Sequence, residues 1–460
     1  MSQHLDDTII AISTASGAGA IAVIRLSGPK AIEYADQYFH GKKLANAESH
    51  TLHFGLIKDG DEVIDEVVIG LFKGPHSYTT EDVVEISCHG SSYIQQRIMQ
   101  LFLKSGVRLA KPGEFTMRAF LNGRMDLSQA EAVADLVAAE SSASHRIAME
   151  QLKGGFSHEL SKLREELIHF ASMIELELDF GEEDVEFADR PQLIALIDRI
   201  LEAINKMILS FELGNVIKNG INTVIAGRPN AGKSTLLNAM LNEERAIVSE
   251  IPGTTRDTIE EILNIEGILF RLIDTAGIRE AQDQIEAIGV KKTFEKAKLA
   301  SILIYVFDVV SVTPDEVKMD LEKLNHPIER TIVIANKMDL NPYTLPEKFE
   351  GDHLPLDHII TASAINSMNI PYLKKRLYEL VTKQGFNTGN VIISNTRHLE
   401  ALNAAAANLN QALANLQNKT TGDFIAMDIR QSLHHIGTIT GDIGVEDLLD
   451  NIFSKFCIGK

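Results

Sequence analysis

Short apolar runs with the length and composition of β-strands mark the first part of the chain. These runs are residues 8–12, 21–26, 67–72 and 83–87. Turns that contain Gly and Pro separate them, as at residues 27–29 and 73–75. The pattern predicts an α+β domain over residues 1–122.

A helical pattern follows, on both sides of a central region. Apolar residues recur at three- and four-residue steps between residues 128 and 213, and an Ala- and Leu-rich run covers residues 398–416. Ser128 and Glu131 have the spacing of a capping box, which predicts a helix start there. A last apolar stripe consists of Val445, Leu448, Leu449, Ile452, Phe453 and Phe456.

The central region alternates buried-type strands with helical runs, as α/β domains do. We therefore predict a multidomain chain with an α/β domain at residues 218–383. This domain is inserted in a discontinuous all-α domain, whose two parts are residues 123–217 and 384–460.

Composition and charge narrow the class of protein. The 460 residues are 45% hydrophobic and 23% charged, and no run approaches the ~18 apolar residues of a membrane span. The N-terminus shows no secretory signal, and two Cys fit a reducing compartment, so we expect a cytoplasmic protein without a membrane partner. A net charge of −20 argues against tight non-specific binding to nucleic acid. A nucleic-acid substrate would need a local basic patch or a basic partner.

The first candidate functional motif is GRPNAGKST, at residues 227–235. They follow the apolar run 221–226 and precede a helix-forming run, which is the context that the phosphate-loop motif requires. Backbone N–H groups of such a loop cradle phosphate oxygens. Lys233 is expected to reach the β- and γ-phosphates, and the Ser234 hydroxyl to ligate Mg²⁺.

Later motifs identify the base. Asp274 ends a strand and opens the sequence DTAG, where it would hold the Mg²⁺ hydration shell while the Gly277 N–H binds the γ-phosphate. Asp339 lies in NKMD, after the strand 331–335, and its carboxylate can accept two hydrogen bonds from guanine. Adenine lacks these donors and would leave Asp339 unpaired, so the site can favour guanine over adenine by ~10⁴-fold. The backbone of Ser363 and Ala364 would meet guanine O6. The order and spacing of the phosphate loop and these later motifs match those of a Ras-like GTPase.

The catalytic apparatus departs from that of small GTPases. Thr255, in GTTRD, is the expected switch residue at Mg²⁺ and the γ-phosphate. The Gln that usually follows DTAG is replaced by Ile278, which cannot orient water. Glu286 can orient water through a second water, although a solvated helix face is its simpler interpretation. Asn230 can offer its side-chain oxygen to a monovalent cation that replaces an arginine finger.

The chain resembles one family along its whole length. The resemblance rests on GRPNAGKS and GTTRD in the central domain, on IAVIRLSGP, SYTTEDVVEISCHG and PGEFTMRAFLNGRMDLSQAEAV before it, and on the C-terminal FCIGK. These stretches are similar to those of the MnmE (TrmE) family of bacterial tRNA-modifying GTPases. The resemblance implies the fold stated above, with a folate-binding-like N-terminal domain and a Ras-like G domain.

For the G domain, the resemblance implies activation by potassium and by face-to-face dimerisation. It makes Glu286 the water-positioning residue and Asn230 the side-chain K⁺ ligand, with backbone oxygens around Ser249, Ile251 and Thr254. The expected catalytic residues are Glu286, Lys233, Thr255 and Gly277, and Ser234 and Thr255 are the expected Mg²⁺ ligands. The expected GTP contacts are Asn230, Ala231, Gly232, Lys233, Ser234, Thr235, Ser249, Glu250, Ile251, Pro252, Gly253, Thr254, Thr255, Asp274, Thr275, Ala276, Gly277, Asn336, Lys337, Asp339, Ser363 and Ala364.

For the N-terminal domain, the resemblance implies a homodimer contact and a site for 5-formyl- or methylene-tetrahydrofolate. The family's folate contacts map onto Arg25, Glu85, Arg124 and Lys460. Position 124 is often Lys in the family, and Arg keeps the charge there but changes the geometry. Cys457 is the family's C-terminal cysteine, either a reactive thiol or a buried helix residue.

The implied activity is GTP hydrolysis in tRNA modification. With an FAD-dependent MnmG (GidA)-like partner, in a heterotetramer, the family adds an aminomethyl-type group to C5 of the wobble uridine, U34, of certain tRNAs. Two alternatives remain open. One is a ribosome-assembly or RNA-binding switch GTPase, for which Gly441–Gly444 mimics a G-x-x-G loop. The other is a stand-alone folate-dependent transferase with a regulatory G domain.

Overall fold

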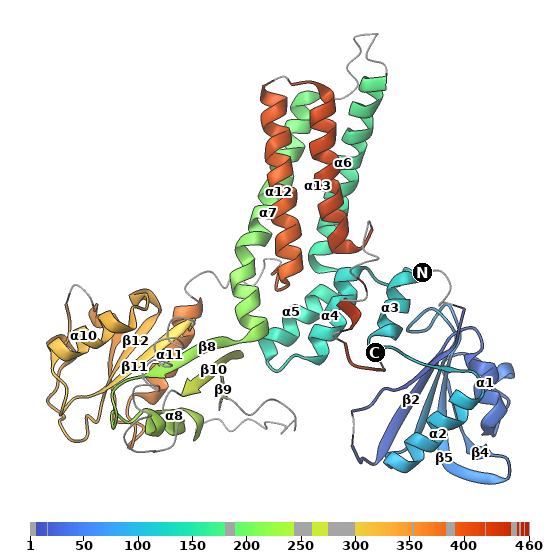
Figure 1. Cartoon of the computed structure of the whole chain (residues 1–460), viewed down its shortest axis with the longest axis horizontal. Coiled ribbons are helices and arrows are strands. Elements are labelled where there is room, and N and C mark those ends of the chain that lie inside the picture. Colours follow the sequence, from blue (N-terminus) through green and yellow to red (C-terminus); the bar gives the residue numbers. More distant parts are fainter. Residues whose placement is uncertain are drawn as a thin grey trace. The chain divides into compact units, whose positions relative to one another are not determined.

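The computed structural model describes most of the chain in two compact units (Figure 1). Outside the described residues lie 1–5, 16, 180–188, 243–259, 275–299, 352–353, 383–391, 419, 443–448, 450–451, 455 and 460. The first unit comprises Met1–Ala138, Ala148–Ile208 and Thr396–Lys460, and the second comprises Ala139–Ile147 and Leu209–Asn395. In the part of the chain that is described, no helix has the length and apolar character needed to cross a membrane.

A seven-stranded sheet forms the N-terminal part of the first unit, in the order β3-β4-β5-β6-β2-β1-β7. Neighbouring strands are antiparallel, except that β1 and β7 are parallel. Two helices, α1 (Ala31–Tyr38) and α2 (Ser92–Lys104), belong to this part. The strands are β1 (Ile9–Ile12), β2 (Ile21–Ser27), β3 (Phe39–His40), β4 (Thr51–Asp59), β5 (Glu62–Phe72), β6 (Val83–His89) and β7 (Arg108–Leu109).

The alternation of side chains along these strands explains which face is buried. Ile24 and Leu26 of β2 point into a core that also contains Ala35 of α1 and Phe102 of α2. The intervening residues point to the opposite face, because successive side chains of a strand alternate. That face carries Arg25, which is only partly buried.

Helices form the remainder of the first unit. Those on the N-terminal side are α3 (Glu114–Leu121), α4 (Leu127–Val137), α5 (Ser142–Leu152), α6 (Gly155–Asp179) and α7 (Arg190–Asn219); α5 and α7 continue into the second unit. After the second unit, the chain returns as α12 (Thr396–Gln417) and α13 (Gly422–Thr440). In Figure 1, α6, α12 and α13 run alongside one another. The periodic residues Leu160, Leu163, Leu167 and Ile174 are buried in α6, as their spacing predicts.

Helix α4 begins with a capping box, but the prediction that Ser128 and Glu131 form it is wrong. The N-cap is Asp126, whose carboxylate accepts from the Gln129 N–H at 2.8 Å, while the Gln129 side chain accepts from the Asp126 N–H at 2.9 Å. Ser128 lies inside the helix and donates to Asp126 at 2.7 Å. Glu131 is not a cap, because partners on a distant helix bind it.

Those partners of Glu131 lie at the start of α12. Arg397 donates to both carboxylate oxygens of Glu131, at 2.9 and 2.8 Å, and His398 Nε2 lies 2.7 Å from one of them. Glu131 is 7% exposed and His398 is fully buried. Burial acts to raise the pKa of Glu131, but His398 and Arg397 outweigh it and lower that pKa to about 2. The charged contact therefore joins two parts of the helical domain that the inserted unit separates in the sequence.

The second unit contains a six-stranded sheet in the order β13-β12-β11-β8-β10-β9, parallel except for β9. Its strands are β8 (Ile221–Ala226), β9 (Glu260–Ile265), β10 (Ile268–Asp274), β11 (Ile302–Asp308), β12 (Thr331–Asn336) and β13 (Ile359–Thr361). Its helices include α8 (Lys233–Asn242), α10 (Pro314–Leu324) and α11 (Ile370–Thr382). Short 3₁₀ turns occur at Leu44–Asn46, Ile328–Arg330, Pro346–Lys348 and Leu356–His358.

Both faces of this sheet are covered. Ile225 of β8 belongs to one hydrophobic cluster and its neighbour Val224 to another. Consequently β11 and β12 are buried almost throughout, as parallel strands between two helical layers are. The loops after β8, β11, β12 and β13 all leave from the carboxyl ends of parallel strands, the usual place for a ligand in an open α/β sheet.

Candidate functional site

The phosphate loop joins β8 to α8 at the carboxyl edge of the sheet. Two of its glycines are required because neighbouring atoms approach them closely. A Cβ on Gly227 would lie 2.0 Å from the Val306 oxygen, and one on Gly232 would lie 2.3 Å from Asn336 Nδ2. Lys233 Nζ donates to the carbonyl oxygens of Gly227 and Arg228, both at 2.9 Å. The loop is thus a tight cradle of backbone, which suits phosphate oxygens.

Asn336 connects the phosphate loop to the base-recognition side of the site. Its side-chain amide donates to the Ala231 carbonyl at 2.8 Å and accepts from the Ala364 N–H at 3.0 Å. The side chain is buried. The Ala364 amide that we expected to face guanine O6 is therefore bonded to Asn336 in this structure.

Asp339 is held in place by its own neighbours. Ser363 Oγ donates to Asp339 Oδ1 at 2.6 Å. Lys337 has a φ of +69° and donates to Asp308 at the end of β11, at 2.9 Å. The structure thus brings Asn336, Lys337, Asp339, Ser363 and Ala364 together at the ends of β12 and β13, next to the phosphate loop.

Asn230 lies in the phosphate loop with a φ of +61° and is exposed. Asn is the residue other than Gly that best tolerates this left-handed conformation. Ser234 and Thr235 are exposed in the first turn of α8. Asp274 ends β10, and its side chain is not described.

Several expected site residues lie outside the described part of the chain. For the nucleotide site these are Ser249, Glu250, Ile251, Pro252, Gly253, Thr254, Thr255, Thr275, Ala276, Gly277, Ile278 and Glu286. For the N-terminal site it is Lys460.

One support of the nucleotide site was missed by the sequence analysis. Arg228, in the phosphate loop, is bonded to Asp320 at 2.7 Å and to Glu316 at 2.6 Å, both on α10. The hydrogen bonds that Arg228 donates to these two carboxylates raise its pKa. Tyr305 Oη also donates to Asp320, at 2.6 Å. The spacing of Thr313 and Glu316, a capping box, is the sequence signal that places Glu316 in the first turn of α10.

A second candidate site lies on the N-terminal sheet. Arg25 of β2 and Glu85 of β6 are direct cross-strand neighbours, and Arg25 Nη2 is 2.8 Å from Glu85 Oε1. Arg124 bonds the Ser77 carbonyl oxygen. A cavity of about 560 Å³ opens here, lined by His50, Phe72, Pro75, His76, Ser77, Tyr78, Val83, Glu85 and Arg124. Three of the four expected folate contacts, Arg25, Glu85 and Arg124, therefore gather around one cavity.

Tyr78 and Gly459 belong to this second site and were not expected. The guanidinium carbons of Arg25 and Arg124 each lie 5.4 Å from the centre of the Tyr78 ring. The Gly459 carbonyl accepts from Arg25 Nη1 at 3.4 Å and from Ser13 Oγ at 3.1 Å. A Cβ on Gly459 would lie 2.3 Å from the Ile12 oxygen, so only Gly fits. The Gly in the C-terminal FCIGK was the available signal for Gly459, whereas no pattern singled out Tyr78.

The two cysteines differ in their surroundings. Cys457 is exposed, and its carbonyl accepts from the Gly113 N–H at 3.3 Å. Cys88 is buried, and burial raises its pKa to about 11. Of the two, Cys457 is therefore the accessible thiol.

Asp339→Asn should weaken guanine-nucleotide binding at least tenfold, because one carboxylate acceptor becomes an amide donor facing the base. Titration calorimetry with GDP measures the loss, and the ratio of GDP to ADP affinity should fall with it. Asp315→Asn, which changes an exposed carboxylate on α10, is the control and should bind normally. An unchanged guanine preference in Asp339→Asn would show that Asp339 does not read the base.

Two family models and many curated relatives match this chain. The model "MnmE helical domain" matches residues 127–457, and "GTP-binding protein TrmE N-terminus" matches residues 8–124. The tRNA modification GTPase MnmE of Cytophaga hutchinsonii is 56% identical over 99% of this chain and 98% of its own. The proteins of the same name from Flavobacterium psychrophilum and Bacteroides thetaiotaomicron are 51% and 49% identical, each over 99% of both chains.

Among solved structures, the G domain of the T. maritima FeoB iron transporter aligns with 35% of this chain and 98% of its own, at 23% identity and a TM-score of 0.27. The relatives, by contrast, extend over all domains, and one of the two family models covers more than half of the chain. The chain therefore belongs to the MnmE (TrmE) family of tRNA modification GTPases.

Proposed function

We propose that this protein hydrolyses GTP and takes part in the modification of tRNA. With an FAD-dependent MnmG (GidA)-like partner, it adds an aminomethyl-type group to C5 of the wobble uridine. The observation that carries the proposal is the presence of two separate sites in one chain that matches relatives of this family over 98–99% of their length. One is a nucleotide cradle around Lys233, and the other is a cavity lined in part by Glu85, which pairs with Arg25. We place the activity in the cytoplasm, where tRNA is found.

The phosphate cradle fits Mg²⁺–GTP. Val306 and Asn336 leave no room for side chains at Gly227 and Gly232, so phosphates can approach the loop's backbone N–H groups. Lys233 would bind the β- and γ-phosphates, and Ser234 and Thr255 would hold Mg²⁺, which neutralises charge on the phosphates. Gly277 would bind the γ-phosphate through its N–H, and Glu286 would position the attacking water.

Tests on tRNA address the whole proposal. Cells without this protein should lose the aminomethyl-type modification at C5 of uridine 34, as measured by mass spectrometry of digested tRNA. Wild-type protein supplied in trans should restore it, and the Asp339→Asn variant should not. Normal wobble uridine in the deleted strain would refute the function, and a defect confined to ribosome assembly would favour the switch-GTPase alternative.

Potassium is the proposed activator of hydrolysis. Asn230 is exposed in the phosphate loop, where its side-chain oxygen is available to a cation. Backbone oxygens around Ser249, Ile251 and Thr254 would complete the shell. A cation there supplies the charge that an arginine finger gives to other GTPases.

GTP hydrolysis should be several-fold faster in KCl than in NaCl at equal ionic strength, because the ligand shell selects by ion size. Phosphate release gives the rates. Asn230→Gly removes the side-chain oxygen but tolerates the left-handed backbone, and it should abolish the difference between the two salts. Equal wild-type rates in K⁺ and Na⁺ would overturn the potassium assignment.

The N-terminal cavity fits a reduced folate. A carboxylate such as Glu85 can accept hydrogen bonds from the donor edge of a pterin, and Arg25 and Arg124 can pair with the carboxylates of the glutamate tail. The folate, either 5-formyl- or methylene-tetrahydrofolate, would supply the one-carbon unit. Lys460 would add a further cation. Cys457 is proposed only as an accessible thiol near this site.

A homodimer is proposed from the open face of the N-terminal sheet. On the face that also carries Arg25 and Glu85, Leu52 and Phe54 of β4 are 74% and 69% exposed. In antiparallel sheets a face that is left open is usually polar, so these side chains favour contact with another protein surface. We assign that surface to a second copy of this chain, and the MnmG-like partner would join the dimer in a heterotetramer.

Phe54→Glu should shift the protein from dimer to monomer, because the interface would have to bury a charge. Light scattering coupled to gel filtration gives the mass. Leu103→Glu is the matched control, since Leu103 is 40% exposed but belongs to α2, which packs on the other face. A dimer that persists in Phe54→Glu would argue against this face.

A further inference from the structure

One irregular loop, residues 73–82, forms part of the wall of the N-terminal cavity. Four cavity-lining residues come from it, namely Pro75, His76, Ser77 and Tyr78. Within the loop, the Tyr78 ring lies against the guanidinium groups of both Arg25 and Arg124. The loop is therefore in direct contact with both cations.

This loop adopts a conformation that its own sequence does not favour. Residues 73–82 form turns and bends without helix or strand. Thr80 has a φ of +65°, a left-handed conformation that a β-branched residue rarely adopts. Such strained backbone persists only where the surroundings determine it. Contacts outside the loop must therefore hold it.

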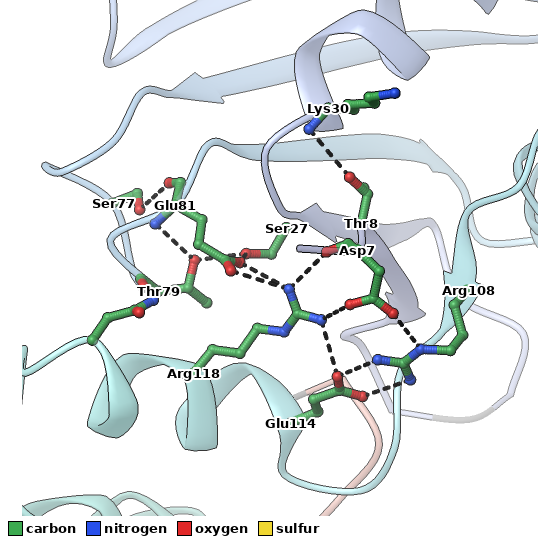
Figure 2. A network of polar contacts seen from close by, with 11 residues as sticks. Asp7, Thr8, Ser27, Lys30, Ser77, Thr79, Glu81, Arg108, Glu114 and Arg118 are labelled. Carbon is green, nitrogen blue, oxygen red and sulfur yellow. Dashed lines mark hydrogen bonds and ion pairs between the residues drawn. The ribbon is translucent and has the colours of Figure 1, made fainter. Parts of the chain in front are cut away.

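Glu81 makes contacts that anchor the loop to Ser27 of β2 and Arg118 of α3 (Figure 2). Its Oε2 accepts from Ser27 Oγ at 2.6 Å, and its two carboxylate oxygens lie 3.1 and 3.3 Å from Arg118 Nη1. Ser27 Oγ is also 2.6 Å from Thr79 Oγ1. Within the loop, Ser77 Oγ donates to the Glu81 carbonyl at 2.5 Å.

Arg118 is the centre of this network. It is fully buried on α3, and Figure 2 shows three carboxylates directed toward it, from Asp7, Glu81 and Glu114. Arg108 bridges Asp7 and Glu114, at 2.6 and 2.5 Å. Of the three carboxylates, only Glu81 belongs to the cavity loop, so it connects the buried network to the cavity.

The pKa values of the three carboxylates are shifted in different directions. For Asp7 and Glu114, burial acts to raise the pKa, but hydrogen bonds from Arg108 and further contacts outweigh it and lower the pKa. For Glu81, burial outweighs Ser27 and Arg118 and raises the pKa. Glu81 is therefore the member of the network whose charge its neighbours compensate least.

We propose that Arg118 and Glu81 are positioning residues for the N-terminal cavity. The buried guanidinium fixes Glu81, and Glu81 holds residues 77–80 so that Tyr78 stays in contact with Arg25 and Arg124. Neither residue lines the cavity. The proposal rests on the proposed function only for the identity of the ligand, a reduced folate.

The test compares Glu81→Gln with Asp7→Asn in the full-length protein. Glu81→Gln keeps the shape but turns an amide donor toward Arg118. Asp7→Asn makes the same chemical change at the same guanidinium, but Asp7 is not in the cavity loop. By hydrogen-exchange mass spectrometry without ligand, amides of residues 73–82 should exchange about tenfold faster in Glu81→Gln and at the wild-type rate in Asp7→Asn.

Binding gives a second readout. The Kd for 5-formyltetrahydrofolate should rise about tenfold in Glu81→Gln, the effect of one hydrogen bond to a charged group, and less than twofold in Asp7→Asn. GDP affinity should be unchanged in both, because the nucleotide site belongs to the other unit of the chain. Melting temperatures show whether the two variants are equally destabilised.

The possible outcomes separate the inference from the proposed function. Wild-type exchange and binding in Glu81→Gln would overturn the positioning role. Equal loosening of the loop in Asp7→Asn would also overturn it, because the network would then be a general structural support. If the wild type fails to bind 5-formyltetrahydrofolate, the folate assignment fails, and the exchange measurement still decides whether Arg118 and Glu81 position the loop.

Discussion

The charged contact of Glu131 with Arg397 and His398 closes a domain that the chain leaves and re-enters. The two sides are 266 and 267 residues apart, and a complete α/β unit lies between them. Because Glu131 is buried and Arg397 binds both of its carboxylate oxygens, loss of Arg397 would break a buried ion pair, at a cost of about 3–5 kcal/mol. The helical domain can therefore complete its core only when both parts of the chain are present, and the C-terminal segment packs against α4 through Phe453 and Leu127.

The two sites are built on different physical principles. The nucleotide site is made mainly of backbone, and Asn336 ties two of its loops together so that small residues are needed where they meet. The N-terminal cavity is made mainly of side chains, and its cations rest on an aromatic ring whose loop is held by buried charges. Backbone sites are fixed by steric exclusion, whereas side-chain sites depend on networks that a single substitution can loosen.

This difference explains what could be predicted from the sequence. Lys233, Asn336 and Asp339 each follow a buried apolar run, so strand ends and motif spacing are enough to place them at one edge of the sheet. Arg118 could not be found in this way, because Asp7 and Glu81 are 111 and 37 residues distant and no local pattern links them. The α4 cap was misassigned for a related reason: D-x-x-Q and S-x-x-E both fit the motif, and only tertiary contacts show that Glu131 is engaged elsewhere.

The contact between Arg25 and Gly459 also depends on the order in which the chain is synthesised. The two residues are separated by 434 positions, and the carbonyl that orients the arginine comes from the C-terminal segment. During synthesis at about 5–20 residues per second, the N-terminal sheet would wait on the order of 20–90 s for this partner. A nascent chain can thus have a folded sheet while Arg25 still lacks its Gly459 partner, so the surroundings of this arginine are finished late in synthesis.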